Sequence, residues 1–356
     1  MKIFFDARWT RLDTVDGITR YGASLLEALA KLTPVTMLIY DERQLAHLPK
    51  DVPYLLINNP ISLRELRFAH RLNQLGADVV VSPMHVIGGG RRHYKLLLTL
   101  HDMIYYHHNQ APTFLPAFSR FVWELFHKAY WPGRWLLDRA DYILTVSETS
   151  KKLIQQYLKP KRPIGVVLNA PQPDLPKLPH DRKIKKDLVY MGSFMPYKNV
   201  EALIASMAYL PDYTLHLLSK IRPERQAELQ ALVPADAKVK FWNGVSDDQY
   251  NELLATATAL MTASKDEGFG LPLIEAMSLG VPVVCSDMAI FREVGGDAAY
   301  YAPADSPKTF ADQVKKLEHS KARADAIELG YKQAAKYTWE NSARELLSII
   351  NSLTEN

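Results

Sequence analysis

The sequence contains almost no cysteine and no long apolar run. Its one cysteine, Cys285, lies in the apolar stretch "VPVVCSD", which excludes a disulfide within the chain and fits a reducing compartment. No apolar run approaches the roughly eighteen residues that a membrane-spanning helix needs. The first residues, "MKIFFDARWT", place only three apolar residues between the lysine and the first acid, too few for a secretory signal. These absences predict a cytoplasmic protein without a membrane span.

What is present is the composition of a soluble globular protein, with 47% hydrophobic and 23% charged residues. At 356 residues the chain is long enough for two or three domains. The net charge of +4 is uneven: residues 1–170 hold 22 Lys and Arg against 14 Asp and Glu, or +8, and the remainder holds 21 against 25, or −4. The basic half indicates contact with an anionic surface or acceptor, although a chance imbalance explains the counts equally well.

Short apolar runs alternate with helical periodicity along the chain. The segment "TRYGASLLEALAKL", for example, places Tyr21, Leu25, Leu26 and Leu29 on one helical stripe. Other runs are typical of strands buried on both faces of a parallel sheet. They are "KIFFDA", "VTMLIY", "PYLLIN", "DVVVSP", "KLLLTLHD", "DYILTVS" and "PIGVVLN", then "LVYMGS", "YTLHLLS", "KVKFWN", "ALMTAS", "VPVVCS" and "AAYYAP". This alternation predicts doubly wound α/β domains.

A proline-rich stretch, "NAPQPDLPKLPHDRKIKKD", interrupts the alternation from Asn169 onward. Its four prolines, four lysines and weak periodicity are typical of a linker. The stretch predicts one α/β domain over 1–170 and a second over 171–340, facing each other across a cleft. The final helix, within 341–356, either packs on the second domain or crosses back to the first.

The stretch "SKDEGFGLPLIEAMSLGVPVVCSD" combines two carboxylates with a glycine turn and the start of a helix. Pro272 suits the first turn of a helix, and Gly268 and Gly270 let the backbone approach a ligand closely. The amides at this helix start form a site for an anion such as a diphosphate. Glu267 and Glu275 bracket that site, and because carboxylates repel phosphate we expect hydroxyls as their partners. The pattern predicts a nucleotide sugar; the alternative is that Glu267 caps the helix and Glu275 is a solvated surface acid.

The same stretch resembles the signature of the retaining glycosyltransferases of family 4, in which seven residues separate two glutamates. Further segments over most of the chain resemble this family: "GITRYGASLLEAL", "LTLHDMIYY", "ADYILTVSETSKKLI", "YMGSFMPYKNVEALI" and "YTWENSARELL". The resemblance implies an α/β protein with the GT-B fold, two facing Rossmann-like domains with parallel sheets and an interdomain cleft. It implies that the first domain binds the acceptor and the second binds the nucleotide sugar.

The resemblance also implies a role for each donor-site residue. Glu267 is expected to hold donor-sugar hydroxyls, Glu275 the ribose, and Lys198 the diphosphate as it departs. The other donor-binding residues implied by their motif positions are Gly17, Ser193, Val245, Gly268, Phe269, Gly270 and Leu271. Ser193 departs from the family pattern, because many relatives carry an arginine there, and Arg20 or backbone donors would then cover the diphosphate. The structural alternatives are an exposed helix-start lysine at Lys198 and an ordinary helix cap at Gly17.

His101 ends a predicted strand at the position where the family's histidine approaches the donor sugar, although a lone strand-end histidine is more often structural. The expected catalytic set is His101, Lys198 and Glu267, and the expected acceptor-binding residues are Arg20, Asp102 and Tyr105. The family implies a front-face substitution that retains the anomeric configuration without a carboxylate nucleophile. The remaining histidines fit no metal-ligand pattern and no Asp-x-Asp pair is present, so we expect no metal and no cofactor.

The segment from Phe114 to Arg139 is rich in aromatic and basic residues, with three tryptophans, four phenylalanines and five basic side chains. Trp123, Phe126 and Tyr130 lie at helical spacing. An aromatic-basic helix of this kind is typical of a membrane interface, which would make the acceptor lipid-linked. The alternative is a core-facing amphipathic helix broken at Pro132–Gly133.

The sequence therefore predicts a retaining glycosyltransferase that moves a hexose from a nucleotide sugar to a growing cell-envelope glycan or a lipid-linked acceptor. "PYKN" and "GITRY" resemble bacterial mannosyltransferases of polysaccharide assembly, so GDP-mannose is the first expected donor; UDP-glucose, UDP-N-acetylglucosamine and dTDP-rhamnose stay open. The expected location is the cytoplasm, at the inner face of an anionic plasma membrane, and no nucleic-acid partner is expected. The alternatives are a nucleotide-sugar epimerase of the same architecture and a glycosyltransferase-like scaffold without turnover.

Overall fold

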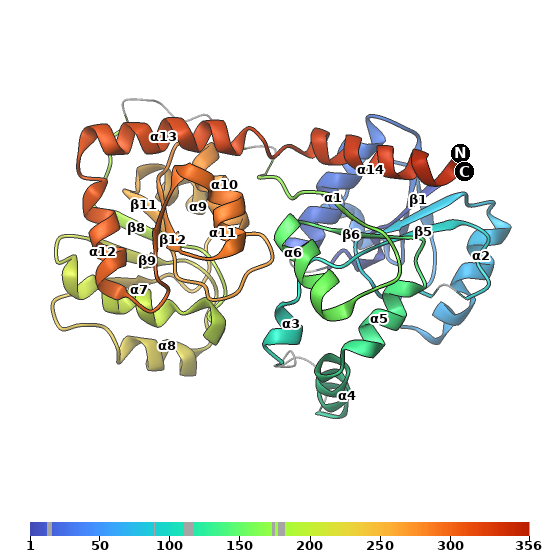
Figure 1. Cartoon of the computed structure of the whole chain (residues 1–356), viewed down its shortest axis with the longest axis horizontal. Helices are drawn as coiled ribbons and strands as arrows, with labels where there is room; N and C mark the ends of the chain where they lie inside the picture. The colour runs from blue at the N-terminus through green and yellow to red at the C-terminus, as the bar shows by residue number, and fades with distance from the viewer. Residues whose placement is uncertain (13–15, 89, 110–116, 173–174, 177–181, 356) are drawn as a thin grey trace. The chain divides into compact units, whose positions relative to one another are not determined.

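The structure, a computed structural model, describes residues 1–12, 16–88, 90–109, 117–172, 175–176 and 182–355. The chain forms two compact units (Figure 1). Unit 1 consists of Met1–Asn169 together with Thr338–Asn356, and unit 2 consists of Ala170–Tyr337. Part of the predicted linker, residues 173–174 and 177–181, lies outside the described residues.

Unit 1 is built on a seven-stranded sheet in the order β3-β2-β1-β4-β5-β6-β7, in which every pair is parallel. The strands are β1 (Ile3–Asp6), β2 (Val35–Ile39), β3 (Tyr54–Leu56), β4 (Val79–Ser82), β5 (Lys95–Thr99), β6 (Tyr142–Thr145) and β7 (Ile164–Val166). All seven coincide with predicted strands. The central strands β1 and β4 are buried along their whole length, as an apolar run in a parallel sheet requires.

The edge strand β3 differs from that expectation. Its three residues, Tyr54, Leu55 and Leu56, are all exposed, at 40%, 37% and 45%. The apolar run predicts a strand buried on both faces, whereas β3 pairs on one side only, with β2. The prediction of burial at this strand is wrong, because an apolar run alone does not reveal whether a strand is central or at the edge.

The helices of unit 1 pack around this sheet. They are α1 (Gly17–Ala30), α2 (Phe68–Gln74), α3 (Ile104–His107), α4 (Ala117–Lys128), α5 (Tyr130–Asp138), α6 (Glu148–Leu153) and α14 (Trp339–Thr354). The predicted stripe of α1 is buried at Tyr21, Leu25, Leu26 and Leu29. The last helix, α14, packs along α1 in unit 1 (Figure 1).

Unit 2 is built on a six-stranded parallel sheet in the order β10-β9-β8-β11-β12-β13. Its strands are β8 (Asp187–Tyr190), β9 (Thr214–Leu217), β10 (Lys238–Phe241), β11 (Ala259–Thr262), β12 (Val283–Ser286) and β13 (Ala299–Ala302). Its helices are α7 (Val200–Ser206), α8 (Pro223–Gln230), α9 (Asp247–Thr256), α10 (Leu271–Ser278), α11 (Ala289–Gly295), α12 (Pro307–Lys316) and α13 (Ser320–Ala334). All six strands coincide with predicted strands, which confirms the doubly wound α/β fold in both units.

Each sheet has one point at which the strand order reverses. In unit 1 the order runs outward in opposite directions from β1 and β4, and in unit 2 from β8 and β11. In open parallel sheets the loops at the carboxyl ends of such strands splay apart and form the ligand crevice. The loops after β1, β4, β8 and β11 are therefore where a binding site is expected.

The aromatic segment of unit 1 breaks at a different place from the one predicted. Helix α4 ends at Lys128 and α5 begins at Tyr130, so the break falls at Ala129, which has an extended backbone. Pro132 lies in the first turn of α5, where its missing amide hydrogen costs no helical hydrogen bond. The predicted break at Pro132–Gly133 is thus wrong, and Phe114, at the start of the predicted segment, lies outside the described residues.

Candidate active site

The loop after β11 and the start of α10 form the centre of the candidate site in unit 2. Gly270 precedes the helix with a φ of 96°, a left-handed conformation that a residue with a Cβ rarely adopts. A Cβ at this position would lie 2.9 Å from the ring of Phe291, so the turn is closed sterically as well. Pro272 stands in the first turn, as predicted. The amides at the start of α10 are therefore held by a glycine turn that tolerates little change.

Glu275 is buried inside α10 and has a phenolic partner. Only 6% of the residue is exposed, and the hydroxyl of Tyr250, on α9, donates to its Oε2 at 3.1 Å. A buried carboxylate needs hydrogen-bond donors, and Tyr250, itself 2% exposed, is one of them. The alternative of a solvated surface acid is wrong. Tyr250 is not identifiable from the sequence, because nothing in its local pattern places α9 against α10.

Glu267 forms an ion pair with Lys198. The ammonium of Lys198 donates to Glu267 Oε2, and the two side chains are only 13% and 20% exposed. Lys198 ends a short turn after β8, η5 (Pro196–Lys198), and Glu267 lies in the loop after β11. The pair therefore joins the loops of the two strands at which the sheet order reverses. Helix α10 has no side-chain cap, so the alternative in which Glu267 caps it is also wrong.

Asn199 fixes the position of Lys198. Its backbone is left-handed, with a φ of 50°, which Asn tolerates better than most residues. Its side-chain amide donates to the carbonyl oxygens of Ala263 at 3.2 Å and Ala304 at 2.8 Å, at the ends of β11 and β13. The amide of Lys265 also donates to the carbonyl of Tyr197 at 2.7 Å. The sequence alone does not indicate this role of Asn199, because its side-chain contacts are with residues more than sixty positions away.

The loop that follows β8 carries Ser193, which is exposed. The hydroxyl of Tyr190 donates to the Ser193 carbonyl at 2.6 Å, which closes this turn. Burial, followed by the nearby Glu267 carboxylate, raises the pKa of Tyr190 well above its ordinary value, so it remains a hydrogen-bond donor. Arg225 reaches the same loop, where it donates to the Phe194 carbonyl at 3.2 Å. Because Arg225 is also paired with Glu201 and Glu228, its charge is already matched by carboxylates.

The other expected donor-binding residues of unit 2 lie in the same set of loops. Phe269 is 3% exposed and packs edge-on against Tyr337, with ring centroids 5.6 Å apart. Gly268 precedes it in the loop after β11, and Leu271 begins α10. Val245 is half-buried in the loop after β10, next to Gly244, whose φ of 102° marks a tight turn. All of these residues are at the carboxyl edge of the sheet.

In unit 1, Gly17 begins α1 directly after its N-cap, Asp16. The Asp16 side chain accepts from the Thr19 amide at 2.9 Å and pairs with Arg11 at 2.6 Å. Gly17 is exposed, and a Cβ there would meet no atom within 4 Å. Arg20, one turn further along α1, is half-buried. The helix start is thus capped by Asp16 and open at Gly17.

His101 follows β5 and is held by its neighbours. Its Nε2 donates to the carbonyl of Pro83, after β4, at 2.8 Å, and Tyr21 packs edge-on against its ring at 4.8 Å. Burial lowers the pKa of His101, so the imidazole is neutral near neutral pH. With its proton on Nε2, Nδ1 has a lone pair and is an acceptor in this tautomer. His101 can therefore accept a hydrogen bond from a substrate hydroxyl.

Asp102 and Tyr105 continue the same edge of unit 1. The Asp102 carboxylate accepts from the Ile104 amide at 3.0 Å, which starts α3. Tyr105 is 49% exposed and packs edge-on against Trp123 of α4, with centroids 5.1 Å apart. Burial of the hydroxyl, followed by the Asp102 charge, raises the pKa of Tyr105. An exposed aromatic ring beside a carboxylate suits the apolar face and hydroxyls of a sugar.

The aromatic side chains of α4 and α5 divide into two groups. Trp123 is half-buried, and its ring lies against that of His127 on the same helix, with centroids 3.9 Å apart. Phe121, Trp131 and Trp135 are exposed, at 58%, 70% and 58%. The core-facing alternative is therefore wrong for this second group. In the described part of the chain, no helix is long and apolar enough to cross a membrane.

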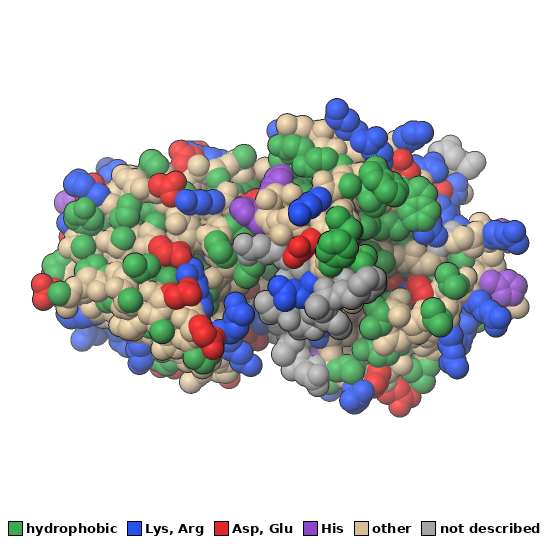
Figure 2. Space-filling model, turned by 90° about the horizontal axis from the view of Figure 1, so that it is seen from below, with side chains coloured by type: hydrophobic (Ala, Val, Ile, Leu, Met, Phe, Trp, Pro, Cys, Tyr) green, Lys and Arg blue, Asp and Glu red, His purple; other side chains and the backbone are tan. Residues whose placement is uncertain are grey.

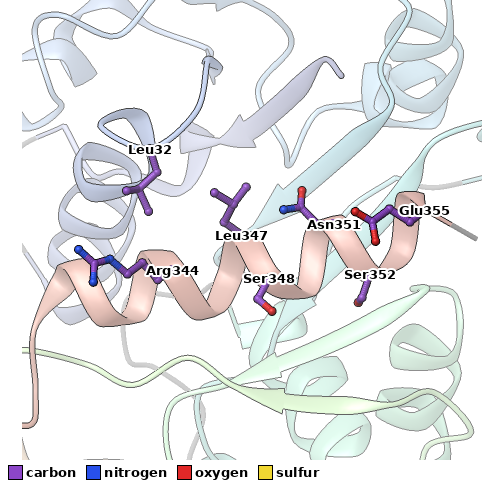
Figure 3. Close-up of a pocket in the computed structure, with 7 residues that line it drawn as sticks. All are labelled: Leu32, Arg344, Leu347, Ser348, Asn351, Ser352 and Glu355. Atoms are coloured by element: carbon purple, nitrogen blue, oxygen red, sulfur yellow. The ribbon is translucent and has the colours of Figure 1, made fainter.

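Other parts of the described chain offer no metal site, and their groove lies elsewhere. No group of three or more His, Cys, Asp or Glu side chains is arranged to hold a metal ion there. A shallow groove runs along α14, lined by Leu32 and by residues between Arg344 and Glu355 (Figure 3). Leu32 follows the far end of α1, about 21 Å of helix away from Gly17 at 1.5 Å per residue. This groove is therefore separate from the expected site residues of unit 1.

Two sequence families match the chain in tandem. Residues 15–174 match the family described as Glycosyltransferase Family 4, and residues 175–333 match the family described as Glycosyl transferases group 1. The chain is 28% identical to the O-antigen chain mannosyltransferase RfbU of Salmonella typhimurium, over 91% of this chain and 93% of that protein. It is 31% identical to the O-antigen chain mannosyltransferase B of Escherichia coli, over 61% of this chain and 62% of that protein, which is less than two thirds of its length.

Solved structures of similar fold cover nearly the whole chain. The Anabaena protein HepE, in complex with UDP and glucose, superposes with a TM-score of 0.73 at 18% identity and covers 99% of this chain and 100% of its own. WaaG, a glycosyltransferase involved in lipopolysaccharide biosynthesis, has a TM-score of 0.67 at 18% identity and covers 98% and 99%. At this level of identity the likeness concerns the fold, and it confirms the GT-B architecture.

Proposed function

Because the chain belongs to the family 4-like glycosyltransferases, we propose that it moves a hexose from a nucleotide sugar to a growing cell-envelope glycan. One observation carries this proposal: a buried, hydrogen-bonded glutamate and a Lys–Glu ion pair flank the amides at the start of α10. The amides and Lys198 suit the diphosphate, Glu275 suits the ribose and Glu267 suits the hexose. A nucleoside diphosphate sugar has these three parts in this order.

The proposed donor is GDP-mannose. The support comes from the relatives, which include O-antigen chain mannosyltransferases, and from the "PYKN" and "GITRY" segments of this sequence. HepE, which shares only the fold, was solved with UDP and with UDP-glucose, so uridine nucleotides are the main alternative. A thermal-shift panel of GDP-mannose, UDP-glucose, UDP-N-acetylglucosamine and dTDP-rhamnose decides among them, because a ligand that binds the native state raises the melting temperature. No shift with any nucleotide sugar would contradict the proposal.

The proposed reaction retains the anomeric configuration. Both carboxylates of the donor site have partners, Glu267 with Lys198 and Glu275 with Tyr250, which favours binding roles over that of a nucleophile. The acceptor oxygen would then attack the face that the diphosphate leaves, and the departing phosphate oxygen would take the acceptor's proton. Lys198 and the α10 amides would stabilise the charge of the leaving group. Proton NMR of the first-formed product distinguishes an α-linked from a β-linked sugar, and an inverted product would overturn this mechanism.

We propose that transfer needs no divalent metal. Lys198 and the start of α10 supply positive charge where the diphosphate would lie, which is the task that a metal performs in other transferases. Initial rates measured in EDTA and with added magnesium should be equal. A strict requirement for magnesium would show that the diphosphate is held differently.

The proposed acceptor is lipid-linked. Exposed Trp131 and Trp135 on α5, with Phe121 on α4, form an aromatic surface in the basic half of the chain. Arg120 and Lys128 both lie on α4, with Phe121. Aromatic side chains flanked by cations favour the interface of an anionic membrane. Replacing Trp131 and Trp135 with alanine should lower turnover on a lipid-linked acceptor more than on a short soluble one.

An epimerase of the same architecture is the second candidate, and it needs no acceptor. It differs in its products: isomerised nucleotide sugar without release of free nucleotide. Chromatography of the nucleotides after incubation with donor alone, and then with acceptor, separates the two reactions. We expect free nucleoside diphosphate to accumulate in step with glycan product.

A further inference from the structure

In a short helix of unit 1, η3 (Leu63–Arg67), the apolar side chains are exposed to solvent and the glutamate faces the interior. Its residues Leu63 and Leu66 are 89% and 88% exposed, and Ile61 before it is 83% exposed. In a 3₁₀ helix residues three apart lie on the same side, so Leu63 and Leu66 share one face. Single exposed leucines are common, but three large aliphatic side chains standing out within six residues form a patch.

The inward-facing residue of η3 is its glutamate. Glu65 accepts from both terminal nitrogens of Arg8, at 2.7 and 3.2 Å, from Asn58 at 2.6 Å and from the Gly88 amide at 2.9 Å. The Arg8 side chain is fully buried and also pairs with Asp6 at 2.7 Å. Breaking such a buried pair leaves an unmatched charge, which is strongly unfavourable. The network therefore fixes the orientation of η3, and the leucines point outward as a consequence.

The outward face is bordered by arginines. Arg64 and Arg67, also three residues apart, are exposed, and Arg71 follows one turn later on α2. Within the described residues, neither Arg64 nor Arg67 has a carboxylate at ion-pair distance, and Arg71 donates to the Leu56 carbonyl at 2.9 Å. The Glu65 carboxylate is only 16% exposed and faces inward to Arg8, which it shares with Asp6. The surface of this segment is therefore apolar at its tip and positively charged around it.

Neighbouring segments of unit 1 also expose apolar side chains. The exposed strand β3 precedes η3, and Val86, in the loop after β4, is 41% exposed. That loop contacts η3 through the Gly88 amide, which donates to Glu65 at 2.9 Å. On the face of unit 1 seen in Figure 2, hydrophobic side chains gather over α4 and α5 with Lys and Arg around them.

We propose that η3 with Ile61 is a lipid-binding segment that inserts Leu63 and Leu66 into the interface of an anionic bilayer while Arg64 and Arg67 bind phosphate headgroups. A bilayer fits better than a protein partner, because the aliphatic side chains protrude instead of lining a groove, and their cations match a diffuse anionic surface. The buried Glu65–Arg8 pair acts as the rigid base that presents them. The inference goes beyond the proposed transfer reaction, since it concerns binding without donor or acceptor.

A site-specific label tests insertion directly. Cys285 is the only cysteine and is fully buried, so Leu66→Cys adds a single accessible thiol for an environment-sensitive dye. We expect its emission to rise on vesicles of phosphatidylglycerol and phosphatidylcholine, to be quenched by spin-labelled lipid, and to be unchanged on phosphatidylcholine alone. The matched control is Leu232→Cys in unit 2, which replaces another exposed leucine (52%) and should show no change.

Vesicle sedimentation supplies the second measurement. The double variant Leu63→Ser, Leu66→Ser should bind anionic vesicles about tenfold more weakly, because burial of one leucine alone is worth at least that factor. Leu232→Ser should bind like the parent, and far-UV circular dichroism checks that all variants are folded. Three results would overturn the proposal: no vesicle binding by the parent, binding without a signal at position 66, or a signal at 66 that rises with protein concentration without lipid, which indicates a second copy. Because no nucleotide is present, these results do not depend on the transfer reaction.

Discussion

At the scale of single residues, Glu267 and Glu275 are the same side chain in two different surroundings. Glu275 is buried with a tyrosine hydroxyl as a donor, whereas Glu267 is paired with a lysine from another loop. A ribose hydroxyl can donate a hydrogen bond to the free lone pairs of the buried Glu275 carboxylate. A hexose hydroxyl can donate to Glu267 in place of the Lys198 ammonium. The surroundings therefore suggest that the two residues act on different parts of one ligand.

This division predicts different binding defects. Glu275→Ala should weaken the binding of the nucleoside diphosphate itself, by about 1–3 kcal/mol, because it removes a charged acceptor. Glu267→Ala should leave nucleotide binding nearly unchanged and lower turnover of the sugar donor. Titration calorimetry with nucleoside diphosphate measures the first effect and steady-state kinetics the second. An equal loss of nucleotide affinity in both variants would contradict the division, and Tyr250→Phe serves as a milder test of Glu275.

Lys198 should act mainly on the chemical step. Lys198→Ala removes a cation that is held in place by the Asn199 turn, and kcat should fall by roughly two to three orders of magnitude, as for loss of one preorganised electrostatic contact. Asn199→Gly keeps the left-handed backbone but removes both side-chain hydrogen bonds. Its kcat should fall less than that of Lys198→Ala. If Lys198→Ala changed only KM, the lysine would serve binding and not departure of the leaving group.

Acid should destabilise unit 1 through His85. Burial, together with the nearby His127 and His101, lowers the pKa of His85 to about 4. Between about pH 6.5 and about pH 4, His85 is therefore protonated in the unfolded chain, where its pKa is about 6.5, and neutral in the folded protein. The contribution of neutral His85 is therefore complete above about pH 6.5 and is lost as the pH falls toward about 4.

Urea unfolding at about pH 7.5 and about pH 5 measures this loss. Tryptophan fluorescence is a suitable probe, since five of the six tryptophans lie in unit 1 and only Trp242 lies in unit 2. The parent should lose more stability between the two pH values than His85→Gln, in which this group no longer titrates. Equal losses would assign the effect to other groups, such as His101 and His127, whose pKa values burial also lowers.

At the scale of elements, two glycines at helix starts differ in how well they tolerate a Cβ. Gly270→Ala should destabilise the protein by about 1–3 kcal/mol, because a left-handed backbone and the Phe291 ring both disfavour a Cβ. Gly17→Ala should be neutral or stabilising by up to about 1 kcal/mol, since the site is open. Thermal and urea unfolding compare the two. Gly17→Ala is then a clean test of donor binding, because any loss of activity would not be a loss of folding.

The elements show what the sequence can and cannot reveal. Strands of a parallel sheet are buried on both faces, so continuous apolar runs predicted all thirteen of them. Whether a run is central or at the edge depends on pairing, and β3 was therefore misjudged. The break between α4 and α5 was placed at Pro132, although proline is harmless in a first helical turn. Helices α11 to α13 were not predicted.

The local features of the candidate site could be predicted from the sequence, whereas its long-range contacts could not. Glycine turns and carboxylate spacing are local, so the start of α10 and both glutamates were identified from the sequence. Tyr250 and the carbonyl partners of Asn199 come from distant strands and helices, and only the fold brings them together. The outward leucines of η3 were also missed, because their exposure follows from the buried contact between Glu65 and Arg8.

At the scale of the whole molecule, unit 1 is discontinuous in sequence and unit 2 is continuous. Helix α14 buries Ala343, Leu346, Ile349 and Ile350 in unit 1, and Trp339 packs against Tyr21 of α1. Each large aliphatic side chain buried in this way contributes about 1.5–3 kcal/mol. Their sum is comparable to the whole stability of an ordinary domain. Unit 1 should therefore depend on the last helix, and unit 2 should not.

Deletion of Thr338–Asn356 tests this dependence. We expect the fluorescence of the truncated chain to show an unfolded or aggregated unit 1. Nucleoside diphosphate should still bind, because Lys198, Glu267 and Glu275 all lie within Ala170–Tyr337. The matched control is Leu347→Ala, Ser348→Ala, which changes residues of α14 outside the buried set. A truncated chain with a native unit 1 would show that α14 is dispensable.

The return of α14 to unit 1 has a consequence for the time course of synthesis. The ribosome makes the first 169 residues of unit 1, then all 168 residues of unit 2, and only then the helix that completes unit 1. At a synthesis rate of about 5–20 residues per second, the apolar side of α1 stays uncovered by α14 for on the order of ten to thirty seconds. The second half of the protein can thus fold before the first. The nascent chain should be most vulnerable to aggregation and proteolysis during that interval. An mRNA with slowly translated codons in the region that encodes unit 2 should lengthen the interval.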